Sequence, residues 1–296
     1  MLSPVARVLA ADLATVGFAP DSLCAKLVAA RIADRGREEY RKLPESITAS
    51  GVWRQTSVHH LGVGASLTDF LVSGIGLDQE RRAEVATLGG TAHLIYAVFD
   101  SLLDNDGCVP DLFSETPAAS LIPGMEAKHQ FVKQLVEIYF KRLGPSVDGP
   151  EHFRSLLEKA IRRLYQAELQ SVSPPASFRQ VWWRKNALPI AVMGMPAWLP
   201  PVSRRYIGFT EHVQWLVRVG EFFGWLDDFA DYDRDETSGH LNRLRLERVI
   251  SVESLAKRVG DKARRIMYLW DSRNRDSPAR DTYRVLVWTW LTNLEI

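Results

Sequence analysis

The segment GEFFGWLDDFADYDRDETSGHLN, residues 220–242, places an apolar and aromatic run directly before a cluster of acidic side chains. Five aspartates fall within nine residues: Asp227, Asp228, Asp231, Asp233 and Asp235. Several of them are three or four residues apart, so a helix would bring their carboxylates onto one face. The segment therefore predicts an apolar helix that ends in concentrated negative charge.

The same helical spacing of apolar residues dominates the rest of the chain, and alternating strand patterns do not recur. Turn-forming stretches such as DGCVPD at residue 106, LGPSVDGPE at 143 and LPPVS at 199 separate the helical segments. Helices are predicted over residues 21–42, 79–105, 124–143, 151–171, 178–198, 203–233, 252–270 and 280–293. We therefore expect one all-α domain over residues 1–296, a single bundle of about ten helices.

Composition narrows the possible functions. The chain has 37 basic and 36 acidic residues, and without a long basic tract it is not expected to bind nucleic acid nonspecifically. Two cysteines and a start without a long apolar run predict a cytoplasmic protein without disulfides. The longest uncharged run, residues 186–203, contains four prolines, so a buried, broken helix is favoured over a transmembrane segment.

A second acidic cluster precedes the first in the chain, in the segment AVFDSLLDNDG at residues 97–107. Asp100 and Asp104 are four residues apart, which on a helix places their Cβ atoms about 6 Å from each other. Each acidic cluster lies at the C-terminal end of an apolar helix, where the helix dipole also disfavours negative charge. In both clusters the carboxylates repel one another and are disfavoured by the helix dipole. Bound cations would offset this repulsion, so the two clusters indicate bound metal ions.

The ligand types point to a hard cation. Carboxylates without histidine or thiolate partners favour Mg²⁺, Mn²⁺ or Ca²⁺ over zinc. An EF-hand is disfavoured, because DYDRDETSGHLN has Glu236 where that loop requires glycine and Asn242 where it requires glutamate. Mg²⁺ usually binds through one or two carboxylates together with water and substrate phosphate oxygens. A phosphate or diphosphate substrate is therefore expected.

FFGWLDDFADYDRDETSG resembles the second aspartate-rich motif of the class I isoprenoid synthase superfamily, and FDSLLD resembles the first. Between them, YQAELQ supplies Gln170 and WWRKNALP supplies Arg184 and Lys185, in the order that the prenyltransferases of this superfamily use. DYDRDETSGHLN looks most like the bacterial branch of large-terpene cyclases and the moenomycin-type prenyltransferase. The resemblance implies a helical bundle around a central cavity, and it permits a homodimer.

The resemblance also implies roles for individual residues, with Mg²⁺ as the metal and Mn²⁺ as a substitute. The expected metal ligands are Asp100, Asp104, Asp227, Asp228 and Asp231. The expected diphosphate-binding residues are Arg184, Lys185 and Arg243. The expected catalytic residues are Asp100, Asp104, Asp228 and Lys185. The expected substrate-pocket residues are Phe99, Gln170, Phe222, Phe223, Trp225 and Phe229, although at least one of the aromatics should face the core.

The function expected from these features is a Mg²⁺-dependent terpene synthase, a lyase that ionises a linear prenyl diphosphate and cyclises or rearranges the carbocation. The alternative is a prenyltransferase that couples the cation to a second acceptor. DNDGCVPD stands where chain-elongating prenyltransferases have paired arginines, which disfavours this alternative. A metal-dependent phosphohydrolase and a helical protein without catalytic activity are further alternatives. His59 and His60 lack a partner at metal-ligand spacing, so they are expected to be structural or exposed.

Overall fold

The chain is helical throughout the residues that its computed structural model describes. These are residues 4–15, 17–49, 53–106, 126–143, 151–171, 177–198, 208–247, 251–271 and 277–292. The helices are α1 (Pro4–Thr15), α2 (Ser22–Arg41), α3 (Glu45–Thr48), α4 (Arg54–Val72), α5 (Gln79–Asp106), α6 (Glu126–Arg142), α7 (Glu151–Ser171), α8 (Phe178–Gly194), η1 (Met195–Trp198, a 3₁₀ turn), α9 (Phe209–Ala230), α10 (Tyr232–Ser238), α11 (Arg243–Leu246), α12 (Val252–Asp271) and α13 (Ser277–Thr292).

The all-α class predicted from the sequence is confirmed, since these ranges contain no strand. Within them there are thirteen α-helices, more than the expected ten or so. The predicted helix at 151–171 has the observed bounds, and those at 21–42 and 79–105 end within one residue of α2 and α5. None of the described helices has both the length and the apolar character needed to cross a bilayer.

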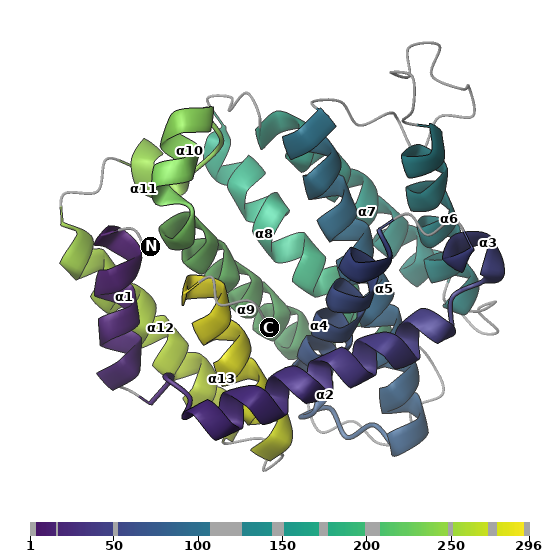
Figure 1. The fold of residues 1–296 in the computed structure, drawn as a ribbon, viewed down its shortest axis with the longest axis horizontal. Helices are drawn as coiled ribbons and strands as arrows, with labels where there is room; N and C mark the ends of the chain where they lie inside the picture. Colours follow the sequence, from purple (N-terminus) through teal and green to yellow (C-terminus); the bar gives the residue numbers. More distant parts are fainter. Residues whose placement is uncertain are drawn as a thin grey trace.

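Helices α8 and α9 run side by side across the middle of the molecule (Figure 1). Helices α5 and α7 pack against α8, while α12 and α13 pack against α9. The long helix α2 crosses α4, which in turn packs along α5. The N-terminal helix α1 packs against α12 and against the last helix, α13, so both ends of the described chain belong to the same packed structure. The acidic ends of α5 and α9 are thereby held on neighbouring parts of the bundle.

Helix α4 is a central element that the sequence pattern does not predict. It contains Gly62 and Gly64, and glycine costs a helix interior about 1 kcal/mol relative to alanine. Tertiary packing explains both residues. A Cβ on Gly62 would lie 2.2 Å from the backbone oxygen of Ile32 in α2, and one on Gly64 would lie 2.4 Å from the Cβ of His93 in α5. The glycines therefore allow α4 to approach both neighbouring helices closely.

Two predicted helices differ from the observed ones at their ends. The helix expected over 178–198 continues through Pro189 as α8 and gives way to the 3₁₀ turn only at Met195. The helix expected over 203–233 is described only from Phe209 onwards, and it ends at Ala230. A short second helix, α10, then begins beyond Asp231, which caps both helices. This break places the last aspartates of the acidic cluster on a separate helix.

Candidate active site

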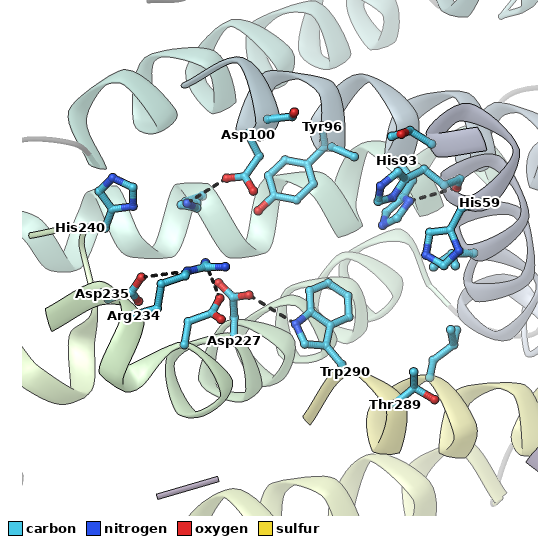
Figure 2. Close-up of a pocket in the computed structure, with 18 of the residues that line it drawn as sticks. His59, His93, Tyr96, Asp100, Asp227, Arg234, Asp235, His240, Thr289 and Trp290 are labelled. Atoms are coloured by element: carbon cyan, nitrogen blue, oxygen red, sulfur yellow. Dashed lines mark hydrogen bonds and ion pairs between the residues drawn. The ribbon is translucent and has the colours of Figure 1, made fainter. Parts of the chain in front are cut away.

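A cavity of about 810 Å³ lies between α4, α5, α8, α9, α10 and α13. Its volume falls within the range typical of small-molecule sites. Acidic and basic side chains and His240 line one end of it, and the histidines of α4 and α5 line the other end (Figure 2). Tyr96 of α5 and Trp290 of α13 lie between the two ends.

The acidic end combines residues from both aspartate clusters. Asp100 projects from α5, while Asp227 and Asp235 approach from the end of α9 and from α10 (Figure 2). Asp231, between these two helices, lines the same end. Asp227 and Asp231 are four residues apart and therefore share a face of the chain as it leaves α9. The indole Nε1–H of Trp290 donates to Asp227 Oδ1 at 3.3 Å, which orients that carboxylate. Two motifs that are far apart in the sequence thus line one cavity.

Lys185 of α8 is the cation closest to Asp100. Its Nζ donates to Asp100 Oδ1 at 3.3 Å and lies 3.2 Å from Glu168 Oε2 on α7. The contact with Glu168 is an ion pair without a well-aligned hydrogen bond, because neither carboxylate oxygen of this buried residue has a hydrogen-bond partner in the described structure. Burial raises the pKa of Glu168 to about 8, against the opposing effect of Lys185. Burial disfavours the charge on Lys185, but Glu168 and Asp100 outweigh it and hold the pKa of Lys185 well above its usual value.

Replacing Lys185 by Met is expected to reduce the free energy of unfolding by about 3 kcal/mol at pH 9, where the wild-type Glu168 is charged, because it leaves Glu168 buried without a cation. Adding Glu168→Gln to this variant should restore much of the loss, since the remaining partner is then neutral. Chemical denaturation of the two single variants and the double variant measures this coupling. The matched control is Arg162→Met, which removes the exposed ion pair with Glu158 on α7 and should cost about 0.5 kcal/mol or less. Additive effects at Lys185 and Glu168 would contradict the pairing.

Arg234 supplies the second cation at the acidic end. It donates to Asp231 Oδ2 at 2.6 Å and lies 3.9 Å from Asp235, while its own side chain is 63% exposed. The buried amide of Asn242 fixes the position of Asp235, because its Nδ2 donates to Asp235 Oδ2 at 3.0 Å and to the backbone oxygen of Asp228 at 2.9 Å. Four carboxylates therefore face two cations along this part of the cavity wall.

The crowding of carboxylates shifts their protonation. Burial, with the charges of Asp100 and Asp235, raises the pKa of Asp227 to about 6 against the opposing effect of Lys185. Burial raises the pKa of Asp231 to about 7, with Asp227 adding to the effect. A cation bound among these groups would relieve their repulsion and stabilise their charged forms. The donor chemistry therefore fits a hard divalent ion that prefers oxygen ligands.

No group of three or more His, Cys, Asp or Glu side chains within the described ranges is arranged to hold a metal ion by itself. Mg²⁺ does not require such a cage, because it commonly keeps water and substrate phosphate oxygens in its coordination shell. Asp104, an expected ligand, falls on α5, but its side chain lies outside the described residues. The carboxylates that line the cavity are Asp100, Asp227, Asp231 and Asp235.

Asp228 lies apart from this group. Asp228 directly follows Asp227 on α9, and one step along an α-helix rotates the side-chain direction by about 100°. Its Oδ2 accepts from the indole Nε1 of Trp182 at 2.9 Å and from the backbone N–H of Arg243 at 3.1 Å. It is buried and is absent from the cavity lining, although it was expected among the metal ligands and catalytic residues. These contacts give Asp228 a structural role, joining α8, α9 and the start of α11.

Asp228→Ala is expected to lower the free energy of unfolding by about 2–3 kcal/mol, because it leaves the indole N–H of Trp182 unpaired in the core. Asp228→Asn should retain the stability of the wild type at pH 7. It keeps an acceptor at the same place, and burial and Asp227 already raise the pKa of Asp228 well above its usual value. Denaturant titration of both variants measures the difference. Equal losses in the two variants would contradict this role.

The aromatic residues expected in the substrate pocket are buried in the hydrophobic core and do not line this cavity. These are Phe99, Phe222, Phe223, Trp225 and Phe229. Phe223 packs against Trp290 with ring centroids 5.1 Å apart, so it supports an aromatic that does line the cavity. The wall facing the acidic end is formed by Tyr96 and Trp290 instead.

Three polar residues expected at the site also lie elsewhere. Gln170 is exposed on α7, and Arg184 is half-buried on α8 outside the lining of the cavity. The guanidinium of Arg243 stacks over Trp182 and Trp225, at 4.7 and 4.6 Å from the ring centroids, and pairs with Glu247. Of the three expected diphosphate-binding residues, Lys185 is the one that the structure places beside the carboxylates.

Several residues at the site were absent from the sequence-based set. Among them Glu168, which contacts Lys185 without lining the cavity, had a readable signal. It continues the apolar stripe of Leu157, Ile161 and Leu164 at helical spacing, and a charged residue in such a stripe indicates a buried functional or paired group. Nothing in the pattern YRVLVWTWL distinguishes Trp290 from the other apolar residues of α13.

No protein-family model, curated protein or solved structure matches this chain. The function must therefore be inferred from the residues of the cavity and their geometry.

Proposed function

We propose that this protein is a class I terpene synthase that, with Mg²⁺, ionises a linear prenyl diphosphate in the cavity and cyclises or rearranges the resulting carbocation. The observation that carries the proposal is the convergence of Asp100 from α5 with Asp227 and Asp231 from the end of α9 on one cavity. These carboxylates, with Asp235, would hold the metal. Bound Mg²⁺ would neutralise the diphosphate and so make it a better leaving group.

The cations of the site complete the diphosphate pocket. Lys185 carries a positive charge beside Asp100, and Arg234 carries one beside Asp231. Both can donate to phosphate oxygens when the substrate enters, which favours the departing anion. Because Arg234 is largely exposed, it lies where a substrate would enter from solvent.

The hydrocarbon chain would extend away from the acidic end, along Tyr96, Trp290, Val63 and Leu286. Aromatic faces stabilise a cation by about 2 kcal/mol or more when it is desolvated. The hydrogen bond from Trp290 to Asp227 fixes the indole next to the place where the cation forms. Where Val63 and Leu286 border the chain the wall is apolar, and there it would limit the access of water, which would otherwise capture the cation.

The test is incubation of the purified protein with geranyl, farnesyl, geranylgeranyl and longer prenyl diphosphates, with and without Mg²⁺. Products are identified by gas chromatography and mass spectrometry. A cyclic or rearranged product formed from one substrate alone supports the proposal. A product that requires isopentenyl diphosphate or another acceptor would establish a prenyltransferase instead. Linear prenyl alcohol with inorganic phosphate would indicate a phosphohydrolase.

A further inference from the structure

Three histidines line the end of the cavity opposite the carboxylates, and the proposed ionisation uses none of them. His59 and His60 belong to α4 and His93 belongs to α5. Their rings form a chain, with centroids 5.1 Å apart between His59 and His60 and 5.2 Å apart between His60 and His93. Figure 2 shows His59 and His93 beyond Tyr96 and Trp290 when viewed from the side of Asp235.

The close packing of α4 on α5 creates this arrangement. Gly64 faces His93, and a Cβ at Gly64 would lie 2.4 Å from the Cβ of His93. Any larger residue at position 64 would move α4 away from α5 and separate the histidines. Gly64 therefore keeps the three histidines together at this end of the cavity.

The hydrogen bond of His93 determines its tautomer. Its Nδ1 lies 3.0 Å from the backbone oxygen of His60, and a carbonyl oxygen can only accept. Nδ1 therefore carries the proton, and in the neutral ring Nε2 has a free lone pair. Nε2 makes no hydrogen bond within the described part of the chain, while the ring, which is 7% exposed, lines the cavity.

The surroundings of His93 keep its ring neutral. Burial, with a smaller contribution from His59, lowers the pKa of His93 to about 4 against the opposing effect of the hydrogen bond to His60. Burial also lowers the pKa of His60, to about 2, and that of His59. The cluster is therefore uncharged at neutral pH. The three rings are not arranged to hold a metal ion, since the described residues contain no such group.

We propose that His93 is the base that ends the reaction, with its Nε2 taking a proton from the carbon next to the cationic carbon. The electron pair of the broken C–H bond becomes the second bond of an alkene, and the imidazole becomes an imidazolium. The imidazolium returns its proton to water after the product leaves. This inference rests on the proposed terpene synthase function, and it assigns the product as an alkene.

A weakly basic imidazole is suited to this step. A carbocation with hydrogen on the neighbouring carbon is a far stronger acid than an imidazolium ion, so proton transfer to His93 is downhill. A more basic histidine would be partly protonated near neutral pH and could not accept the proton. The distance between the two ends of the cavity also separates this base from the released diphosphate.

The experiment compares the wild type with His93→Asn, whose Nδ2 can replace Nδ1 as donor to the His60 carbonyl but which has no basic nitrogen. Diphosphate and organic products are measured in the same reaction. We expect diphosphate release within about threefold of the wild type. Alkene formed per diphosphate should fall at least about tenfold, with alcohol from water capture replacing it. The matched control is Gln55→Ala, at an exposed position of α4 outside the cavity lining, which should leave the alkene yield unchanged.

An unchanged yield of alkene per diphosphate in His93→Asn overturns the inference and leaves the terpene synthase proposal standing. A wild type that releases no diphosphate from any prenyl diphosphate overturns both. A second measurement does not depend on activity. In ¹⁵N NMR spectra of the full chain labelled at histidine, His93 should remain neutral and protonated at Nδ1 at pH 5.5. An Nε2-protonated ring, or titration near the ordinary value of about 6.5, overturns the inference.

Discussion

Replacing Asp227 by Asn is expected to slow Mg²⁺-dependent diphosphate release by at least about 100-fold, which corresponds to a loss of about 3 kcal/mol of transition-state stabilisation. Asn is neutral and a weaker ligand, yet it still offers an oxygen to the indole N–H of Trp290, so the local hydrogen bond survives. The loss therefore reports on charge and metal binding, and not on the fold. Steady-state diphosphate release at saturating substrate and Mg²⁺ measures it.

The matched control for this prediction is Asp233→Asn. Asp233 belongs to the same acidic cluster but is exposed on α10 and does not line the cavity. Its replacement should leave the rate within about twofold of the wild type. If Asp227→Asn and Asp233→Asn have the same rate, the cavity carboxylates do not have the proposed role.

The crowded carboxylates also make the metal-free protein sensitive to pH. The folded state holds the pKa of Asp227 at about 6 and that of Asp231 at about 7, well above the ordinary value of 3.8. Between about pH 4 and pH 7 the folded state therefore binds more protons than the unfolded state, so stability falls as the pH rises through this range. At pH 8 the repulsion among the charged groups is fully present.

The double variant Asp227→Asn/Asp231→Asn should therefore be more stable than the wild type at pH 8 by at least about 2 kcal/mol, a rise of roughly 5 °C in melting temperature. At pH 4 the difference should largely disappear, because both wild-type carboxyls are then protonated. Thermal unfolding in the presence of a chelator measures both values. A difference that does not change with pH would contradict the raised pKa values. Stability gained at the cost of activity is typical of functional sites.

Helical periodicity predicted most of the long helices of this fold, because apolar spacing along one helix is local information. Helix α4 was missed because its glycines lower helix propensity, and their purpose becomes visible only when α2 and α5 pack against them. The break between α9 and α10 was missed for a related reason. Apolar spacing continues into the acidic cluster, while the cap at Asp231 depends on backbone geometry.

The site was only partly predictable. Spacing of four residues selected Asp100, Asp227 and Asp231, all of which line the cavity. It also selected Asp228, because sequence alone does not show that Trp182 and Arg243 occupy its carboxylate. The aromatics next to the motif were equally ambiguous, since an apolar core and an apolar cavity wall require the same residue types. Trp290 comes from α13, and only tertiary packing brings it to the cavity, whereas His93 lies on α5 seven residues before Asp100 and on the same face of that helix.

The most direct test of the two-cluster account is a crystal structure of the protein with Mn²⁺ and inorganic diphosphate, with the metal located by its anomalous scattering. The account predicts Mn²⁺ within coordination distance of Asp100 on α5 and of Asp227 or Asp231 at the end of α9, with diphosphate oxygens completing its shell. Lys185 or Arg234 should then contact the diphosphate. Anomalous density bound elsewhere on the protein, or none at the acidic end of the cavity at saturating Mn²⁺ and diphosphate, would contradict it.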